Sequence, residues 1–156
     1  MIIRPLKVTD VTALHHNCYT GRPLREVQDH LTRFLAGQKE GRLVCLVAEV
    51  DGQAVATGQL TLLPGARPAR RAAAEIGSLV VAPAYRRQGI GTALIRALIE
   101  QARQRRVQTL EIAADVDRPW LRAWYERLGF TYQREHDFPG QRVALLTMDL
   151  TEGDPT

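Results

Sequence analysis

The sequence predicts one α/β domain built on a mixed, mostly antiparallel twisted sheet, with a parallel central strand pair and flanking helices. A strand, a helix and a strand follow one another across residues 74–114, and such a crossover joins parallel strands. Turn-forming pairs, Asp51-Gly52 and Pro139-Gly140, separate apolar segments and indicate antiparallel hairpins. The 156 residues, 45% of them hydrophobic, suffice for one core without metal or disulfide.

The first half of the chain is predicted to hold three strands and two helices. Leucine and valine recur at helical spacing over residues 24–35, and Gly37 and Gly41 bound the end of that helix. Thr9 or Asp10 can cap the helix before it. In chain order we expect a strand over 2–4, a helix to Cys18, a helix over 24–35, strands over 43–50 and 54–62, and a loop over 64–71.

The second half is predicted to hold four strands and two helices. Pro119 suits the first turn of the last helix and Gly129 its C-terminal cap. In order we expect a central strand over 74–81, a helix over 92–106, a strand from 107 or 108 to 114, a helix over 119–128, and a hairpin of 131–138 with 143–150. The domain then covers residues 1–150, and residues 151–156 form a polar tail.

Composition narrows the class of protein. No apolar run reaches the ~18 residues of a membrane span, and the N-terminus lacks the shape of a secretory signal, so we expect a cytoplasmic protein with no membrane partner. Cys18 and Cys45 are expected to be free thiols. The net charge of +4, carried almost entirely by arginine, allows nucleic-acid binding. Attraction of a phosphate-bearing small molecule explains it better, and we expect no nucleic-acid partner.

The segment Leu79–Leu94 is the most informative part of the chain. An apolar strand passes through a Pro83 turn into a loop with two arginines and two glycines, and a helix follows. Gly89 and Gly91 let the backbone turn and let a ligand approach the main chain. The unpaired N–H groups at the helix start favour an anion. The pattern predicts a phosphate cradle that is neither a Walker loop nor a dinucleotide fingerprint.

This segment resembles the cofactor motif of the GCN5-related N-acetyltransferase (GNAT) superfamily. Arg86, Gly89 and Gly91 match its Arg/Gln-x-x-Gly-x-Gly/Ala pattern, after a Val-x-Pro-x-Tyr lead-in. The resemblance implies acetyl-CoA as cosubstrate and an amine acceptor as the second partner. It also implies a set of cofactor-binding residues in which Leu79 N–H serves as oxyanion donor and Val81 pairs with the pantetheine amides. The set comprises Leu79, Val80, Val81, Arg86, Arg87, Gln88, Gly89, Ile90, Gly91 and Thr92.

Trp124-Tyr125-Glu126-Arg127-Leu128-Gly129-Phe130 is similar to the second motif of the family, aromatic-Tyr-x-x-x-Gly-Phe. The resemblance implies that Tyr125 protonates the departing thiolate, since a phenol is neutral at pH 7 and still a donor. The alternative is that Tyr125 only packs in the core. Many family members carry an asparagine about two helical turns before this tyrosine, near the position of Arg118 here. Arg118 either contacts the cofactor or is solvated.

The acceptor amine must lose a proton before acetyl transfer, because an alkyl ammonium has a pKa near 10. Glu75, on the strand before the cradle, is the first candidate for the general base by analogy with family members, and an ordered water chain is the alternative. Glu111 and Asp115 are weaker candidates. Otherwise Glu75 faces solvent at the start of its strand or pairs with a nearby arginine, and Glu111 is a solvated strand residue.

Two functions of the protein remain open from the sequence. One is an acetyl-CoA-dependent N-acetyltransferase acting on a small molecule or peptide by direct transfer in a ternary complex. The other is a non-catalytic acetyl-CoA sensor or interaction module. No spacing of His, Cys and Asp suits a metal, so the four histidines, His15, His16, His30 and His136, are expected to be structural or solvated. The exposed last strands allow pairing into a homodimer, and the amine acceptor itself carries no readable motif.

Overall fold

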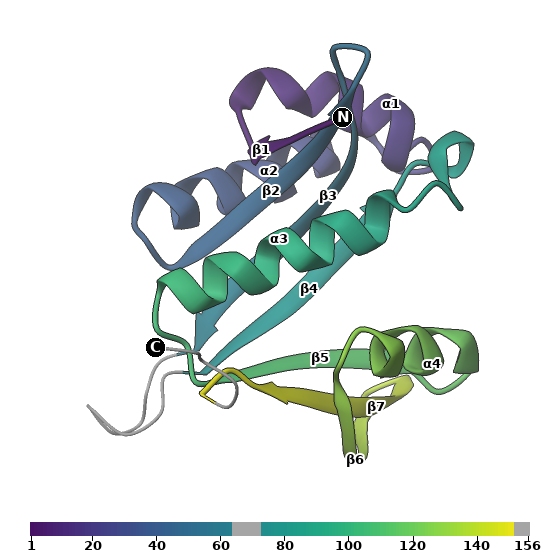
Figure 1. Ribbon diagram of the computed structural model, residues 1–156. Helices are drawn as coiled ribbons and strands as arrows, with labels where there is room; N and C mark the ends of the chain where they lie inside the picture. Colours follow the sequence, from purple (N-terminus) through teal and green to yellow (C-terminus); the bar gives the residue numbers. More distant parts are fainter. Residues whose placement is uncertain (64–72, 152–156) are drawn as a thin grey trace.

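A computed structural model describes residues 1–63 and 73–151 (Figure 1). The predicted loop over 64–71 lies outside the described residues. The strands are β1 (Ile2–Pro5), β2 (Leu43–Val50), β3 (Gln53–Leu63), β4 (Ala73–Val81), β5 (Thr109–Asp115), β6 (Thr131–Phe138) and β7 (Gln141–Asp149). The helices are α1 (Val11–Cys18), α2 (Leu24–Lys39), α3 (Ile90–Gln104) and α4 (Pro119–Arg127), with 3-10 turns at Val8–Asp10 and Pro83–Tyr85.

The seven strands form one sheet in the order β1-β2-β3-β4-β5-β7-β6. Every neighbouring pair is antiparallel except β4 and β5. The helix between β4 and β5 is α3, which makes the crossover that a parallel pair requires. The predicted fold class is therefore confirmed.

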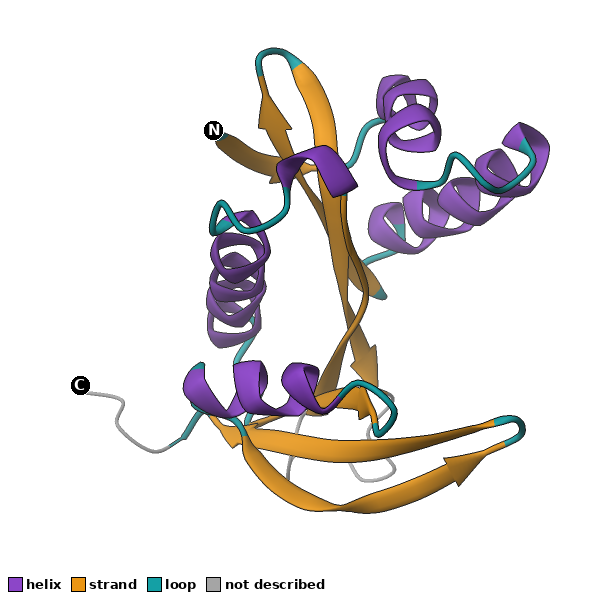
Figure 2. Ribbon diagram, turned by 90° about the vertical axis from the view of Figure 1, so that its right-hand side faces the viewer, coloured by secondary structure: helices purple, strands orange, loops and turns teal. Residues whose placement is uncertain are grey.

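The helices cover the sheet unequally (Figure 2). Helices α3 and α4 lie on one face, and α1 and α2 lie on the other over the β1–β3 half. Strand β2 is buried on both faces, since Val44 and Leu46 belong to the core under α3 whereas Cys45 and Val47 belong to the core under α1 and α2. This two-sided burial explains why β2 is an almost continuous apolar run rather than an alternating one.

Helix α2 continues beyond the end expected from the sequence. It passes through Gly37 to Lys39, so the prediction that Gly37 bounds it is wrong. A Cβ on Gly37 would lie 2.8 Å from Leu43 Cδ2, which shows that this glycine provides space for close packing of the helix on β2. The helix ends at Lys39, and Gly41, two residues further on, has a φ of +78° and donates its N–H to the Gln38 carbonyl as a left-handed cap.

The predicted turns and the last helix cap are present. Asp51 and Gly52 have φ of +50° and +80°, as a two-residue hairpin turn needs. At the end of α4, Gly129 has φ of +106°, its N–H bonds the Glu126 carbonyl, and the Phe130 N–H bonds the Tyr125 carbonyl. Helix α3 begins and ends two residues before its predicted limits. No helix in the described part of the chain is both long and apolar enough to cross a membrane.

Candidate functional site

The predicted cradle is a sharply turned loop that leads into α3. Arg87 and Gly89 have φ of +64° and +79°, so two left-handed residues bend the chain directly before the helix. Gly89 is the N-cap and has no side chain to bond the first N–H groups of α3. The side chain of Ile90 is buried and anchors the loop, whereas residues 86–89 are exposed. The uncapped helix start and the two neighbouring arginines make a positive site open to an anion.

The edge of β4 next to this loop is free of a strand partner. Pairing between β4 and β5 stops at Ile76 and Ile112, and the two strands then diverge. The Ala82 N–H donates to the Val55 carbonyl on β3. Because successive N–H groups in a strand point to opposite sides, those of Val81 and Leu79 face the gap between β4 and β5. The Val81 carbonyl, on the same edge, accepts a 3.2 Å bond from Arg86 Nε.

A bulge in β4 lies beside this free edge, and no local sequence pattern predicts it. Ser78 has φ of +51°, and the β3–β4 register shifts between Thr57 and Gln59. The residue skipped on β3 is Gly58, where a Cβ would lie 2.8 Å from Leu79 Cδ1. Gly58 therefore makes room for the Leu79 side chain, and the bulge bends the strand where its N–H groups face the gap.

The structure gives Gly91 a role different from the predicted one. A Cβ on this residue would lie 3.1 Å from Trp124 Cη2 and 3.6 Å from Val81 Cγ2. Its missing side chain therefore admits the Trp124 ring between α3, α4 and β4, and close approach of a ligand is not what requires glycine here. Trp124 Nε1 also donates to Thr92 Oγ1 at 3.1 Å. The Thr92 hydroxyl keeps its own hydrogen to donate.

Tyr125 lies on α4 next to Trp124, whose ring packs against Gly91 at the start of α3. The residue is 5% exposed, and its ring contacts Trp124 and Phe130, whose ring centroids are 5.3 and 6.3 Å away. Burial raises the pKa of Tyr125 to about 12, so the phenol stays protonated at neutral pH. Its hydroxyl makes no hydrogen bond with a described residue, although it is not sealed from solvent. The ring is packed in the core, and its hydroxyl is free to donate, so protonation of a departing thiolate stays a prediction.

The three carboxylate candidates lie on the face opposite α3. Glu75 is opposite Glu111 in the β4–β5 register. Asp115 lies four residues further along β5, where it accepts a bond from the Asp117 N–H. Desolvation, followed by the charge of Glu111, raises the pKa of Glu75 above its usual range. Glu75 precedes Leu79 by four residues, which in an extended strand is about 13 Å. A base at Glu75 thus needs a water between it and an amine at the gap.

The remaining candidates are divided between the site and the surface. Val80, between Leu79 and Val81, pairs with Thr57 of β3 and packs toward the core under α1 and α2, so its backbone faces away from the gap. Arg87, Gln88 and Arg118 are exposed and make no side-chain bond to a described residue. Arg118 is the N-cap of α4.

Neither cysteine has the properties of a nucleophile. Cys18 is the last residue of α1, its sulfur lies 3.5 Å from the Val55 carbonyl on β3, and desolvation raises its pKa to about 11. Desolvation likewise raises the pKa of Cys45 to about 11. Both thiols are free, as expected from the sequence. In the described part of the chain, no three His, Cys, Asp or Glu side chains come together as a metal would need.

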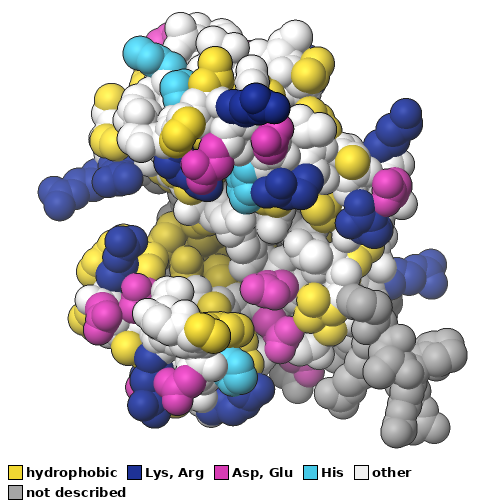
Figure 3. All heavy atoms as spheres, turned by 180° about the vertical axis from the view of Figure 1, so that it is seen from behind, with side chains coloured by type: hydrophobic (Ala, Val, Ile, Leu, Met, Phe, Trp, Pro, Cys, Tyr) yellow, Lys and Arg dark blue, Asp and Glu magenta, His cyan; other side chains and the backbone are white. Residues whose placement is uncertain are grey.

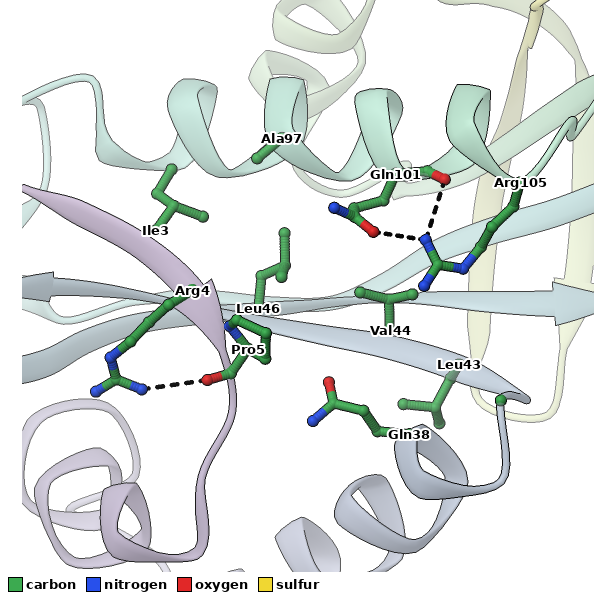
Figure 4. Close-up of a pocket in the computed structure, with 11 residues that line it drawn as sticks. Ile3, Arg4, Pro5, Gln38, Leu43, Val44, Leu46, Ala97, Gln101 and Arg105 are labelled. Atoms are coloured by element: carbon green, nitrogen blue, oxygen red, sulfur yellow. Dashed lines mark hydrogen bonds between the residues drawn. The ribbon is translucent and has the colours of Figure 1, made fainter.

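A cavity of about 390 Å³ lies elsewhere, between β1, β2 and the C-terminal halves of α2 and α3 (Figure 4). On the α3 side it is lined by Ala97, Gln101 and Arg105, and Arg105 is bonded to Gln101. Since the cradle is at the other end of α3, this cavity does not coincide with the predicted cofactor site. The candidate site is an open gap in the sheet rather than an enclosed pocket.

Comparison with models of known protein families shows to which family the chain belongs. Residues 8–130 match the family model described as the acetyltransferase (GNAT) family. The chain belongs to this family. Both the cradle and the segment from Tyr125 to Phe130 fall within the matched range of the GNAT domain.

A curated relative and several solved structures resemble this GNAT chain. An uncharacterized N-acetyltransferase from Methanocaldococcus jannaschii is 41% identical over 61 residues, which make up 39% of this chain and only 27% of that protein. A ribosomal-protein-alanine N-acetyltransferase from Brucella melitensis has a TM-score of 0.79 at 22% identity, covering 96% of this chain and 100% of the other. A putative acetyltransferase from Salmonella typhimurium, solved with its cofactor acetyl-CoA, has a TM-score of 0.77 at 18% identity, covering 98% and 95%. At these identities the solved structures establish the GNAT fold alone.

Proposed function

We propose that the protein is an acetyl-CoA-dependent N-acetyltransferase that moves an acetyl group to a primary amine of a small molecule or peptide by direct transfer. The observation that carries the proposal is the gap between β4 and β5. It places the free N–H groups of Leu79 and Val81, the uncapped start of α3 and the α4 helix of Tyr125 around one space.

The residues around the gap suit acetyl-CoA. The start of α3 with Arg86 and Arg87 would hold the diphosphate, and Gly89 has no atom within 4 Å of where a Cβ would stand, which leaves the mouth of the cradle open. The free N–H of Val81 would pair with the pantetheine as a further strand does. When bound, acetyl-CoA supplies the acetyl group as a reactive thioester. A Salmonella typhimurium neighbour was solved with acetyl-CoA and a Thermoplasma acidophilum neighbour with coenzyme A, which supports this assignment.

Three residues of the candidate site then have defined roles in the reaction. Glu75, through a water, takes the proton that the acceptor ammonium must lose, and the freed nitrogen lone pair forms the new N–C bond. The Leu79 N–H stabilises the charge that develops on the carbonyl oxygen. Tyr125 Oη donates its proton to the sulfur as the C–S bond breaks. No side chain of the protein carries the acetyl group, so both substrates are bound together.

Release of free thiol from acetyl-CoA with a panel of amines tests the proposal. We expect amine-dependent thiol release at one thiol per acetylated amine. Initial rates at varied concentrations of both substrates should give intersecting double-reciprocal lines, as a ternary complex does; parallel lines would indicate a covalent intermediate. Tight binding of acetyl-CoA with no turnover of any amine would refute the enzymatic assignment and favour a sensor.

A further inference from the structure

One side-chain hydrogen bond joins helix α4 to the first turn of α3. Trp124 Nε1 lies 3.1 Å from Thr92 Oγ1, and Thr92 is the third residue of α3. An indole N–H can only donate, so the threonine oxygen must be the acceptor in this bond. The hydroxyl hydrogen of Thr92 then points elsewhere, and it meets no acceptor among the described residues.

Packing of the Trp124 ring fixes the direction of this bond. The ring atoms Cη2 and Cζ2 lie 3.1 and 3.3 Å from where a Cβ of Gly91 would stand, and the ring centroid is 5.3 Å from that of the buried Tyr125. A larger residue at position 91 would displace the ring. Glycine at this position therefore lets the indole reach Thr92.

The Thr92 hydroxyl lies beside other donors that have no acceptor. The first backbone bond of α3 runs from the Ala93 N–H to the Gly89 carbonyl, so the N–H groups of residues 90–92 have no backbone acceptor in the described part of the chain. Side chains of a helix tilt toward its N-terminus, which places the Thr92 oxygen over this same turn. The hydroxyl is therefore a fourth donor at the start of α3.

A threonine in a helix has another use for its hydroxyl, which is to bond the carbonyl one turn earlier. For Thr92 that carbonyl belongs to Gln88, in the cradle. The structure has the bond with Trp124 and none with this carbonyl. The hydroxyl hydrogen thus remains available to a ligand.

We propose that Trp124 is a positioning residue for the cofactor, because its N–H holds the Thr92 hydroxyl in the orientation that donates to the diphosphate of CoA. This inference rests on the proposed function. A hydrogen bond to a charged phosphate oxygen is shorter and stronger than one between neutral groups. Trp124 therefore contributes to cofactor affinity through Thr92 and not through a contact of its own with the diphosphate.

The location of the bond separates its effect from that of the acceptor. Trp124 and Thr92 lie on α4 and α3, which cover the same face of the sheet (Figure 2). The opposite face has a hollow lined by hydrophobic side chains between the upper and lower parts of the molecule (Figure 3). An acceptor that reaches the gap from this hollow does not meet the Trp124 ring. Loss of the indole N–H should therefore change the KM for acetyl-CoA and not the KM for the amine.

Trp124→Phe removes the N–H and keeps an aromatic ring against Gly91, and Trp120→Phe, 60% exposed on the same helix, is its control. In calorimetric titrations we expect Trp124→Phe to weaken CoA binding about fivefold or more and Trp120→Phe to change it less than twofold. With S-acetylpantetheine, which lacks the diphosphate, kcat/KM of Trp124→Phe should stay within about twofold of the wild type. Unchanged CoA affinity, or an equal loss with both acetyl donors, would overturn the inference, since an equal loss indicates a merely structural role.

Variants of Thr92 test whether Trp124 acts through this hydroxyl. We expect Thr92→Val to weaken CoA binding about tenfold or more and Thr92→Ser, which keeps the hydroxyl, to stay within about twofold. Adding Trp124→Phe to Thr92→Val should then cause no further loss. Losses that multiply in the double variant would overturn the inference and leave the proposed function intact. A wild-type protein that binds no CoA would instead refute the proposed function, and this inference with it.

Discussion

Replacing Gly89 by alanine separates the effect of backbone strain from the effect on the cofactor, because the fold contains a matched control. Gly89 and Gly52 have φ of +79° and +80°, and a Cβ at either position would meet no atom within 4 Å. Gly52 lies in the β2–β3 hairpin turn, outside the candidate site. The two substitutions therefore impose the same backbone cost at two places that differ in function.

The expected cost follows from the left-handed conformation. An alanine there costs about 1–2 kcal/mol in the folded chain, and the loss of glycine entropy in the unfolded chain offsets about 0.4–1 kcal/mol. We expect both variants to lose about 1 kcal/mol of unfolding free energy in urea titrations, a shift of roughly 2–4 °C in Tm for a chain of this size. Only Gly89→Ala should weaken CoA binding by calorimetry, by about tenfold or more, since its Cβ enters the mouth of the cradle.

Two results would refute this reasoning. If Gly89→Ala and Gly52→Ala bound CoA with equal affinity, the loop before α3 would not be the phosphate site. If their unfolding free energies differed by much more than ~0.5 kcal/mol, the assumption of matched backbone strain would be wrong.

Three other predictions concern single residues. Tyr125→Phe should lower kcat about tenfold or more while CoA affinity stays within about twofold; steady-state kinetics and calorimetry check it, and unchanged kcat would remove Tyr125 from the mechanism. Because the pKa of Glu75 is raised, the fold favours its protonated form and loses stability as that carboxyl ionises. Glu75→Gln should thus be more stable than the wild type at neutral pH by ~0.5 kcal/mol or less for this exposed side chain, with no difference at acid pH. It should also abolish the acid limb of the kcat/KM profile, and a retained limb would exclude Glu75 as base. Arg106 closes α3 with φ of +58°, so Arg106→Gly should raise the unfolding free energy by about 0.5–1 kcal/mol in urea titrations, and a loss would contradict the assigned strain.

Much of the fold could be predicted because its elements are locally encoded. The Asp51-Gly52 turn and the Gly129 cap depend on backbone conformations that few residues other than glycine adopt readily. The local sequence alone is therefore enough to locate them. The prediction that Gly37 ends its helix is wrong for the opposite reason. Its helix continues because the missing Cβ is needed for contact with Leu43, a residue on another element, and no local pattern reports that contact.

The candidate site likewise has features that local sequence predicts and features that depend on contacts between distant residues. The order of strand, turn, arginines and helix located the cradle, since these residues are contiguous. The roles of Gly58 and Gly91 could not be predicted, because each depends on a distant side chain, Leu79 or Trp124, that occupies the space of the missing Cβ. The pairing of Glu75 with Glu111 likewise requires the register of two strands that are separated by a helix.

Titration of the protein with CoA and with pantetheine tests the central claim most directly, since the two ligands differ by the diphosphate and nucleotide. If the bent loop before α3 and the start of that helix bind the diphosphate, CoA should give saturable 1:1 heat and pantetheine should bind at least about a hundredfold more weakly. No heat from CoA, or equal affinity for the two ligands, would contradict the claim.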